Sequence, residues 1–135
     1  MRVVLDTNVV VSGALTAHGA CARVLDVLLG DAFEICADDR ILSEYDSVLR
    51  RPELRMAARD VETVMELLSH VAVSVAAPPL AARLPDPDDL PFLEVAAAAG
   101  AILVTGNARH FPKAACKGVT VVSPKEFLEL LRRLA

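Results

Sequence analysis

Short apolar runs alternate along the chain with longer segments that have helical spacing. Five runs are predicted as strands, at 2–5, 33–36, 71–75, 101–105 and 119–122. Helical spacing or capping signals mark the segments 20–29, 39–51, 61–70, 89–99 and 124–134. The strands are continuously apolar rather than alternating, which is typical of a parallel sheet buried on both faces. The pattern therefore predicts an α/β fold of three layers, α/β/α, with a mostly parallel five-stranded sheet.

Stop and start signals support several of these boundaries. Gly30 and Gly100 directly follow two predicted helices, and Pro52 lies just past a third. Residues 123–126, Ser-Pro-Lys-Glu, match a capping box with proline at the first helical position. The last helix is therefore expected to begin at Pro124.

The size and charge of the chain limit how many domains it forms and how it could bind nucleic acid. A length of 135 residues suits one domain, and we expect a single domain over 1–135. The formal net charge of −4 gives no overall attraction to nucleic acid, so contact with nucleic acid needs a local basic patch or a bridging metal ion. Two basic clusters are candidates, around 50–59 and around 109–117.

Neither a membrane span nor a secretory leader is expected. The longest apolar run, 95–104, is about half of the roughly 20 residues that a spanning helix needs, and an acid already stands at position 6. The three cysteines form no C-x-x-C pair, so a disulfide framework or a structural zinc site is not expected. These features favour a cytoplasmic protein with reduced cysteines.

A functional site is expected where the predicted strands end, because ligands of parallel sheets bind outside the carboxyl ends of the strands. The first strand ends in Asp6 and the fourth in Thr105-Gly106-Asn107. The acidic run 86–89 opens a helix, and its Asp89 is predicted on the sheet-facing side, whereas Glu94 is predicted on the opposite, solvated side. On the helix over 39–51, Glu44 and Asp46 fall at the two edges of the apolar stripe, and periodicity does not choose between them.

No motif for a nucleotide-cradling loop or a nucleophilic serine is present. The histidines at 18, 70 and 110 have no metal-ligand spacing with another histidine or a cysteine. Carboxylates spread along the chain remain, and such a set suits hard divalent cations that prefer oxygen ligands.

Four segments, in order and with matching spacing, resemble the motifs of PIN domains, a family of Mg²⁺- or Mn²⁺-dependent nucleases. They are 4–9 (Val-Leu-Asp-Thr-Asn-Val), 42–45 (Leu-Ser-Glu-Tyr), 86–89 (Asp-Pro-Asp-Asp) with the apolar positions after it, and 104–107 (Val-Thr-Gly-Asn) followed by His110 and Phe111. The chain looks most like the small prokaryotic VapC-like toxins of toxin–antitoxin pairs. In that resemblance Asn107 stands where the fourth motif usually supplies an aspartate, so one negative charge is missing.

The resemblance implies a PIN-like fold and metal-dependent hydrolysis of RNA phosphodiester bonds. It implies a catalytic set of Asp6, Glu44, Asp89 and Asn107, in which the three carboxylates hold Mg²⁺ or Mn²⁺. It leaves open which of Asp86, Asp88 and Asp89 ligates the metal. Supporting roles fall to the hydroxyl, amide and carboxyl groups of Thr7, Asn8, Asp86, Asp88 and Thr105, and contacts to the RNA backbone fall to Arg109 and Lys113. It further implies a cognate antitoxin as partner and a homodimer.

Two other functions remain open. A degenerate PIN-fold protein would bind RNA or a partner protein with little or no cleavage, and Asn107 is the feature that favours it. An enzyme that forms an aspartyl phosphate on Asp6 is a weaker alternative, because Asn8 occupies the place where such chemistry commonly has a second acid.

Overall fold

The computed structural model describes residues 1–134, apart from the side chain of Leu29. The strands are β1 (Arg2–Leu5), β2 (Glu34–Ala37), β3 (Val73–Ser74), β4 (Ile102–Val104) and β5 (Val121–Val122). The α-helices are α1 (Thr7–Leu15), α2 (Ala20–Leu29), α3 (Asp39–Leu49), α4 (Ala58–Val71), α5 (Leu90–Ala99) and α6 (Pro124–Leu134). Four short 3₁₀ turns lie in the connections: η1 (Pro52–Leu54), η2 (Pro87–Asp89), η3 (Ala108–His110) and η4 (Lys113–Ala115).

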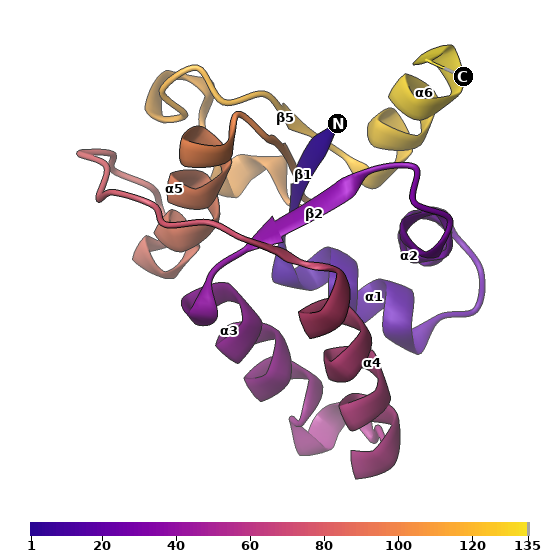
Figure 1. Cartoon of the computed structure of the whole chain (residues 1–135). Coiled ribbons are helices and arrows are strands. Elements are labelled where there is room, and N and C mark those ends of the chain that lie inside the picture. The colour runs from indigo at the N-terminus through magenta and orange to yellow at the C-terminus, as the bar shows by residue number, and fades with distance from the viewer. Residues whose placement is uncertain (135) are drawn as a thin grey trace.

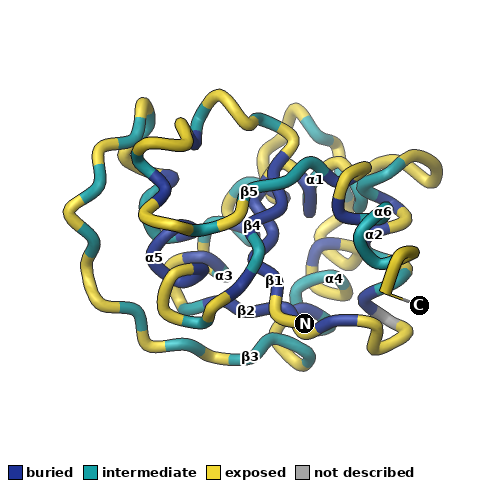
Figure 2. The backbone as a smooth tube through the Cα atoms, turned by 90° about the horizontal axis from the view of Figure 1, so that it is seen from above, coloured by how far each residue is buried: buried dark blue, intermediate teal, exposed yellow. Residues whose placement is uncertain are grey.

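The five strands form one sheet in the order β3-β2-β1-β4-β5, and every adjacent pair is parallel (Figure 1). Helix α5 packs on one face of the sheet, whereas α2 and α6 lie on the other face (Figures 1 and 2). Helices α3 and α4 form a hairpin that extends beyond the sheet. The predicted three-layer α/β/α architecture is therefore confirmed.

The central strand β1 is the most deeply buried element of the sheet. Val3, Val4 and Leu5 have no exposed surface, since β1 has a strand on each side and a helical layer on each face. The edge strands β3 and β5 are shorter than the sequence predicted, because each pairs on one side only. The carboxyl ends of β1 and β4 therefore lie side by side, with Leu5 in register with Val104.

Local signals set several of the helix ends. The predicted capping box is present: the backbone N–H of Ser123 donates to Glu126, and the N–H of Glu126 donates to the Ser123 hydroxyl. The apolar segment after β1 forms α1, which crosses α2 closely at Gly13. A Cβ at Gly13 would lie 2.8 Å from the carbonyl oxygen of Cys21, so any larger residue would push the two helices apart.

A long connection, residues 75–86, links β3 to η2; we call it the strap. It runs around the outside of α5 with exposed and half-buried residues in turn (Figure 2). The N–H of Leu80 donates to the Glu94 carboxylate at 2.8 Å, and Arg40 at the start of α3 donates to the same carboxylate at 2.7 Å. The prediction that Glu94 is solvated was wrong: it is 4% exposed, because the strap and Arg40 cover the outer side of α5.

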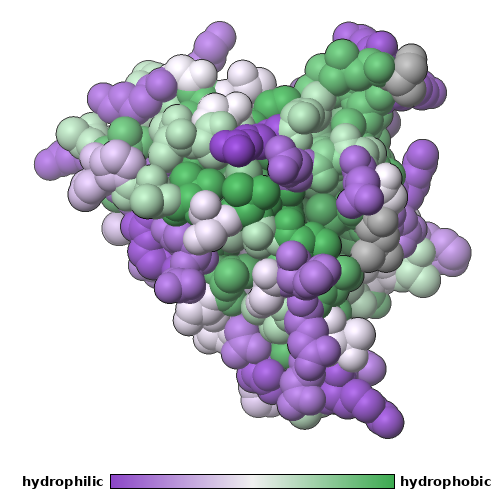
Figure 3. Space-filling view, viewed as in Figure 1, coloured by the Kyte–Doolittle hydropathy of each residue, from purple (hydrophilic) through white to green (hydrophobic). Residues whose placement is uncertain are grey.

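Apolar side chains gather at the centre of the face shown in Figure 3 and again along α6, with hydrophilic side chains at the periphery. Within residues 1–134, no helix is both long enough and apolar enough to span a bilayer.

Candidate functional site

A pocket of about 430 Å³ opens beside the carboxyl ends of the central strands. Its lining comes from the β1–α1 junction, one side of α3, the α3–α4 connection, and the η2 and η3 turns. The lining residues are Asp6, Thr7, Asn8, Val11, Glu44, Val48, Arg51, Glu53, Leu54, Asp86, Asp88, Asp89 and His110. The structure thus brings the three predicted carboxylates Asp6, Glu44 and Asp89 into one pocket, although they are far apart in the sequence.

Asp6 is held rigidly at the end of β1. One carboxylate oxygen accepts the N–H of Thr7 at 2.8 Å and caps α1, and the other accepts the hydroxyl of Thr105 at 2.7 Å. The Asn8 amide reaches Asp6 at 3.5 Å and accepts the N–H of Gly106, so it joins the β1 end to the β4 end. Asp6 is 4% exposed, and this burial raises the pKa of its carboxyl despite the hydrogen bonds, which lower it.

Glu44 reaches the pocket from the middle of α3, where the Thr7 hydroxyl donates to its carboxylate. The neighbouring Tyr45 donates its hydroxyl to the carbonyl of Leu5 and so ties α3 to the end of β1. Asp46, the other flank position, instead accepts from Arg50 at 3.0 Å, one turn further along α3. The structure therefore separates the two acids that periodicity left equivalent.

The acidic run before α5 places its members differently. Asp86 uses one oxygen to accept the N–H of Asp88 at 3.0 Å, which caps the η2 turn. Asp88 is exposed, half-buried Asp86 borders the pocket, and Asp89 is 9% exposed. Burial raises the pKa of Asp89 to about 6, and the negative charges of Asp6 and Asp86 add to this rise.

The fourth motif reaches the pocket through His110, which was not among the predicted site residues because it has no metal-ligand spacing with another histidine or a cysteine. Its Nδ1 lies 2.9 Å from the Asp89 carboxylate, and its Nε2 lies 2.9 Å from the Asn107 amide nitrogen. With that amide as donor, Nε2 accepts and Nδ1–H donates to Asp89. Asn107 itself is not among the lining residues. Its amide contacts the imidazole of His110, which does line the pocket.

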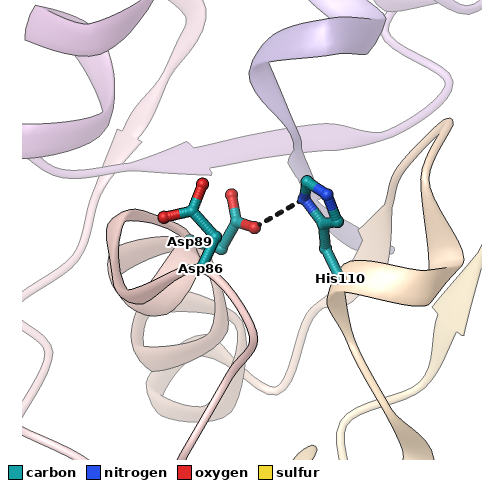
Figure 4. Close-up of side chains that lie close together, drawn as sticks. All are labelled: Asp86, Asp89 and His110. Atoms are coloured by element: carbon teal, nitrogen blue, oxygen red, sulfur yellow. Dashed lines mark hydrogen bonds and ion pairs between the residues drawn. The ribbon is translucent and has the colours of Figure 1, made fainter.

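Among the described residues, Asp86, Asp89 and His110 form a group whose potential ligand atoms are close enough to share one metal ion. One potential ligand atom from each lies within 4.8 Å of the others, and the Asp89 carboxylate points toward the imidazole, to which a dashed line joins it (Figure 4). The signal that could have found His110 is its place at the end of the fourth motif, three residues after Asn107. One turn of η3 brings it back toward Asp89.

The basic residues predicted to contact RNA lie elsewhere. Arg109 and Lys113 are exposed on η3 and η4, outside the pocket lining, and Lys113 borders a separate cavity beside β5. Among the described residues, Arg51 is the only arginine or lysine that lines the pocket. The positive charge at the pocket therefore comes from the α3–α4 connection rather than from the loop after β4.

Comparisons with known proteins agree with the fold. A family model described as the PIN domain matches residues 2–109. The uncharacterised protein MJ1680 of Methanocaldococcus jannaschii is 26% identical over 140 residues, covering 96% of this chain and 90% of that protein.

Two solved structures share the architecture. One is VapBC2 from Rickettsia felis bound to a DNA fragment from its promoter, with a TM-score of 0.61 and 16% identity. The other is FitAcB from Neisseria gonorrhoeae, with a TM-score of 0.57 and 17% identity. Each similarity covers 91% of this chain and 98% of the matched chain.

Proposed function

Because the chain belongs to the PIN domain family, we propose that it is a divalent-metal-dependent ribonuclease that hydrolyses RNA phosphodiester bonds. The observation that carries this proposal is the convergence of Asp6, Glu44 and Asp89 on one pocket at the carboxyl ends of parallel strands. These side chains come from three different elements. Acids that only cap helices or keep the surface soluble would have no reason to meet in one pocket.

The donor set fits Mg²⁺ or Mn²⁺. Two of the carboxylates are almost fully buried, and the pKa values of both Asp6 and Asp89 are raised, chiefly because burial disfavours the charged form and also because other carboxylates lie nearby. Asp6, Glu44 and Asp89 would hold the ion, with Asp86 and His110 beside them as further donors. When bound, the ion supplies Lewis-acid polarisation of a phosphate oxygen and acidification of water.

The chain's own groups would keep these ligands in place. Thr105 and the Thr7 N–H orient the two oxygens of Asp6, and the Thr7 hydroxyl orients Glu44. Asn107 orients His110, which in turn donates to Asp89. We assign Asn107 to this positioning role instead of to direct contact with metal or phosphate.

A cleavage assay tests the proposal. Asp6→Asn keeps the shape of the side chain but removes its charge, and we expect it to lower Mg²⁺- or Mn²⁺-dependent cleavage of a mixed RNA pool at least about 100-fold. Asp46→Asn is the matched control, because Asp46 is an acid at the other edge of α3 that pairs with Arg50; it should cut like the parent. Equal cleavage by the parent and Asp6→Asn, or cleavage that persists in EDTA, would contradict the proposal.

We also propose that the protein is the toxin of a toxin–antitoxin pair, acting in the cytoplasm as a homodimer. The support is the fold shared with FitAcB and with VapBC2, which was solved bound to a DNA fragment from its promoter, together with the resemblance of the four motifs to those of VapC-like toxins. The partner would be an antitoxin that covers the pocket. Co-expression with the product of an adjacent reading frame, followed by light scattering, tests the partner and the dimer together.

The alternative is a PIN-fold protein that binds RNA or a partner without cutting. It predicts retention of RNA by the parent without products at any Mg²⁺ or Mn²⁺ concentration. The observation that favours it is that an amide and an imidazole, Asn107 and His110, occupy the fourth motif in place of a carboxylate.

A further inference from the structure

We infer that Arg51 binds a backbone phosphate of the RNA next to the one that is cut. The inference rests on the proposed ribonuclease function and adds the residue that would hold the strand beside the acidic pocket. It concerns the segment 50–59, which runs from the end of α3 into the first turn of α4 and which we call the elbow.

Arg51 lies just beyond the carboxyl end of α3, next to the side of that helix that lines the pocket. Glu44 and Val48 lie four residues apart on one side of α3, Arg51 follows the end of that helix, and all three line the pocket. Arg51 itself has extended backbone, two residues beyond Leu49, the last residue of α3. The pocket therefore combines carboxylates from several elements with a guanidinium that the elbow supplies.

The charge balance of the pocket singles out this arginine. Its lining holds six carboxyl side chains and, within the described residues, a single arginine or lysine, Arg51. Arg51 makes no ion pair with any described acid, although Glu53 lines the same pocket two residues further on. An unpaired guanidinium offers a planar set of donors that matches the oxygens of a phosphate.

The neighbouring arginine shows the contrast. Arg50 donates from Nε to both oxygens of Asp46, at 3.0 and 3.2 Å, so its charge is already compensated. Both residues are exposed and adjacent in the sequence. Arg50 is thus a natural control for a general loss of positive charge at the elbow.

The backbone at Arg51 is well defined, which limits the conformational entropy lost on binding. Its N–H donates to the carbonyl of Val48, and its own carbonyl accepts the N–H of Leu54. The following Pro52 restricts Arg51 to extended backbone, observed at φ −60° and ψ 130°. The elbow continues with the exposed Arg55 and Arg59, and hydrophilic side chains cover this end of the hairpin in Figure 3.

Binding and salt dependence test the inference. The probe is a fluorescent single-stranded RNA of mixed sequence, titrated by anisotropy in Ca²⁺ in place of Mg²⁺, with the RNA verified intact on a gel. Arg51→Gln should raise the Kd about fivefold, the size expected of one exposed charge contact. It should also reduce the slope of log Kd against log salt by about 0.7, the loss of one contact to single-stranded nucleic acid. Arg50→Gln should change neither quantity, and Arg51→Lys should recover the slope.

The outcomes separate this inference from the proposed function. If the parent cuts RNA and Arg51→Gln retains the parent's affinity and salt slope, the inference is wrong and the ribonuclease proposal stands. An equal loss in Arg50→Gln would also overturn it, because the effect would then be that of overall charge. A parent that neither binds nor cuts RNA would contradict the function and the inference together.

Discussion

Asp89, which directly precedes α5, and Glu94, which lies within it, are two buried acids five residues apart. They differ in whether a positively charged side chain of the protein compensates for the carboxylate. Glu94 is 4% exposed and accepts from the Arg40 guanidinium and from the Leu80 N–H, both within 2.8 Å. Asp89 is 9% exposed and lies near the carboxylates of Asp6 and Asp86, and among the described residues only the His110 imidazole donates to its side chain. Glu94 therefore has the Arg40 guanidinium as its counter-charge, whereas we expect a bound metal ion to neutralise Asp89.

This difference separates a structural carboxylate from a functional one. Burying a charge is costly unless a partner compensates for it. Glu94 is compensated by groups that are permanent parts of the fold, and it fastens the strap and α3 to α5. Asp89 is kept crowded with other acids, which favours the bound state of a divalent ion over the empty pocket.

The largest expected effect is on catalysis through Asp89. Asp89→Asn should lower Mn²⁺-dependent RNA cleavage at least about 100-fold, equivalent to roughly 3 kcal/mol of activation free energy, because a charged ligand is lost. The same change should leave the metal-free protein as stable as the parent or more so. Cleavage kinetics and thermal unfolding in EDTA measure the two effects, and a destabilised Asp89→Asn protein would contradict the assignment.

The next effect is on the pH dependence of stability. Because the pKa of Asp89 is raised to about 6 in the folded protein, the unfolded chain releases this proton at lower pH than the folded chain does. The contribution of Asp89 to stability should therefore decrease from about pH 4 to just above pH 6, by up to roughly 3 kcal/mol, and stay constant above that.

Urea unfolding in EDTA at pH 4.5 and pH 7 measures this decrease, and the Asp89→Asn variant provides the baseline for all other groups. Adding Mn²⁺ at pH 7 should restore the lost stability. An identical pH profile in the parent and Asp89→Asn would contradict the raised pKa of Asp89 and its cost in stability.

A smaller effect is expected on stability at Glu94. Glu94→Gln removes the charge that pairs with Arg40 but keeps an acceptor for Leu80, and we expect a loss of about 2 kcal/mol in the free energy of unfolding, since Arg40 is partly exposed. Glu62→Gln, an exposed acid on α4, is the control and should change stability by less than about 0.5 kcal/mol. Urea denaturation of both variants checks the prediction; a Glu94→Gln protein as stable as the control would remove the contrast with Asp89.

The smallest effect is expected at Asn107. Its amide faces His110 and lies outside the pocket lining, so the charge added by Asn107→Asp would be separated from the ion by the imidazole. We expect the Kd for Mn²⁺, measured by calorimetry, to stay within about threefold of the parent value. A change of tenfold or more would place Asn107 among the metal ligands and would contradict its role as the residue that orients His110.

Much of the fold was determined locally and was therefore predictable from the sequence. The apolar runs of β1 and β4, the capping box of α6 and the glycine after α5 each depend on neighbours in the sequence or on a buried parallel sheet, and all were confirmed. The placement of Asp6 at a strand end followed from the same pattern. The order of the motifs also indicated which acids to examine together.

What only the tertiary structure decided involves contacts between distant segments. The helical period put Glu44 and Asp46 at equivalent edges of α3, and the choice came from the Thr7 hydroxyl, which is 37 residues away from Glu44 in the sequence. The burial of Glu94 depends on a strap that has no regular structure and therefore no periodicity to predict. His110 lines the pocket because of the η3 turn, and Arg51 lines it because it follows the end of α3. Hydrophobic periodicity does not predict the direction of side chains in such irregular segments.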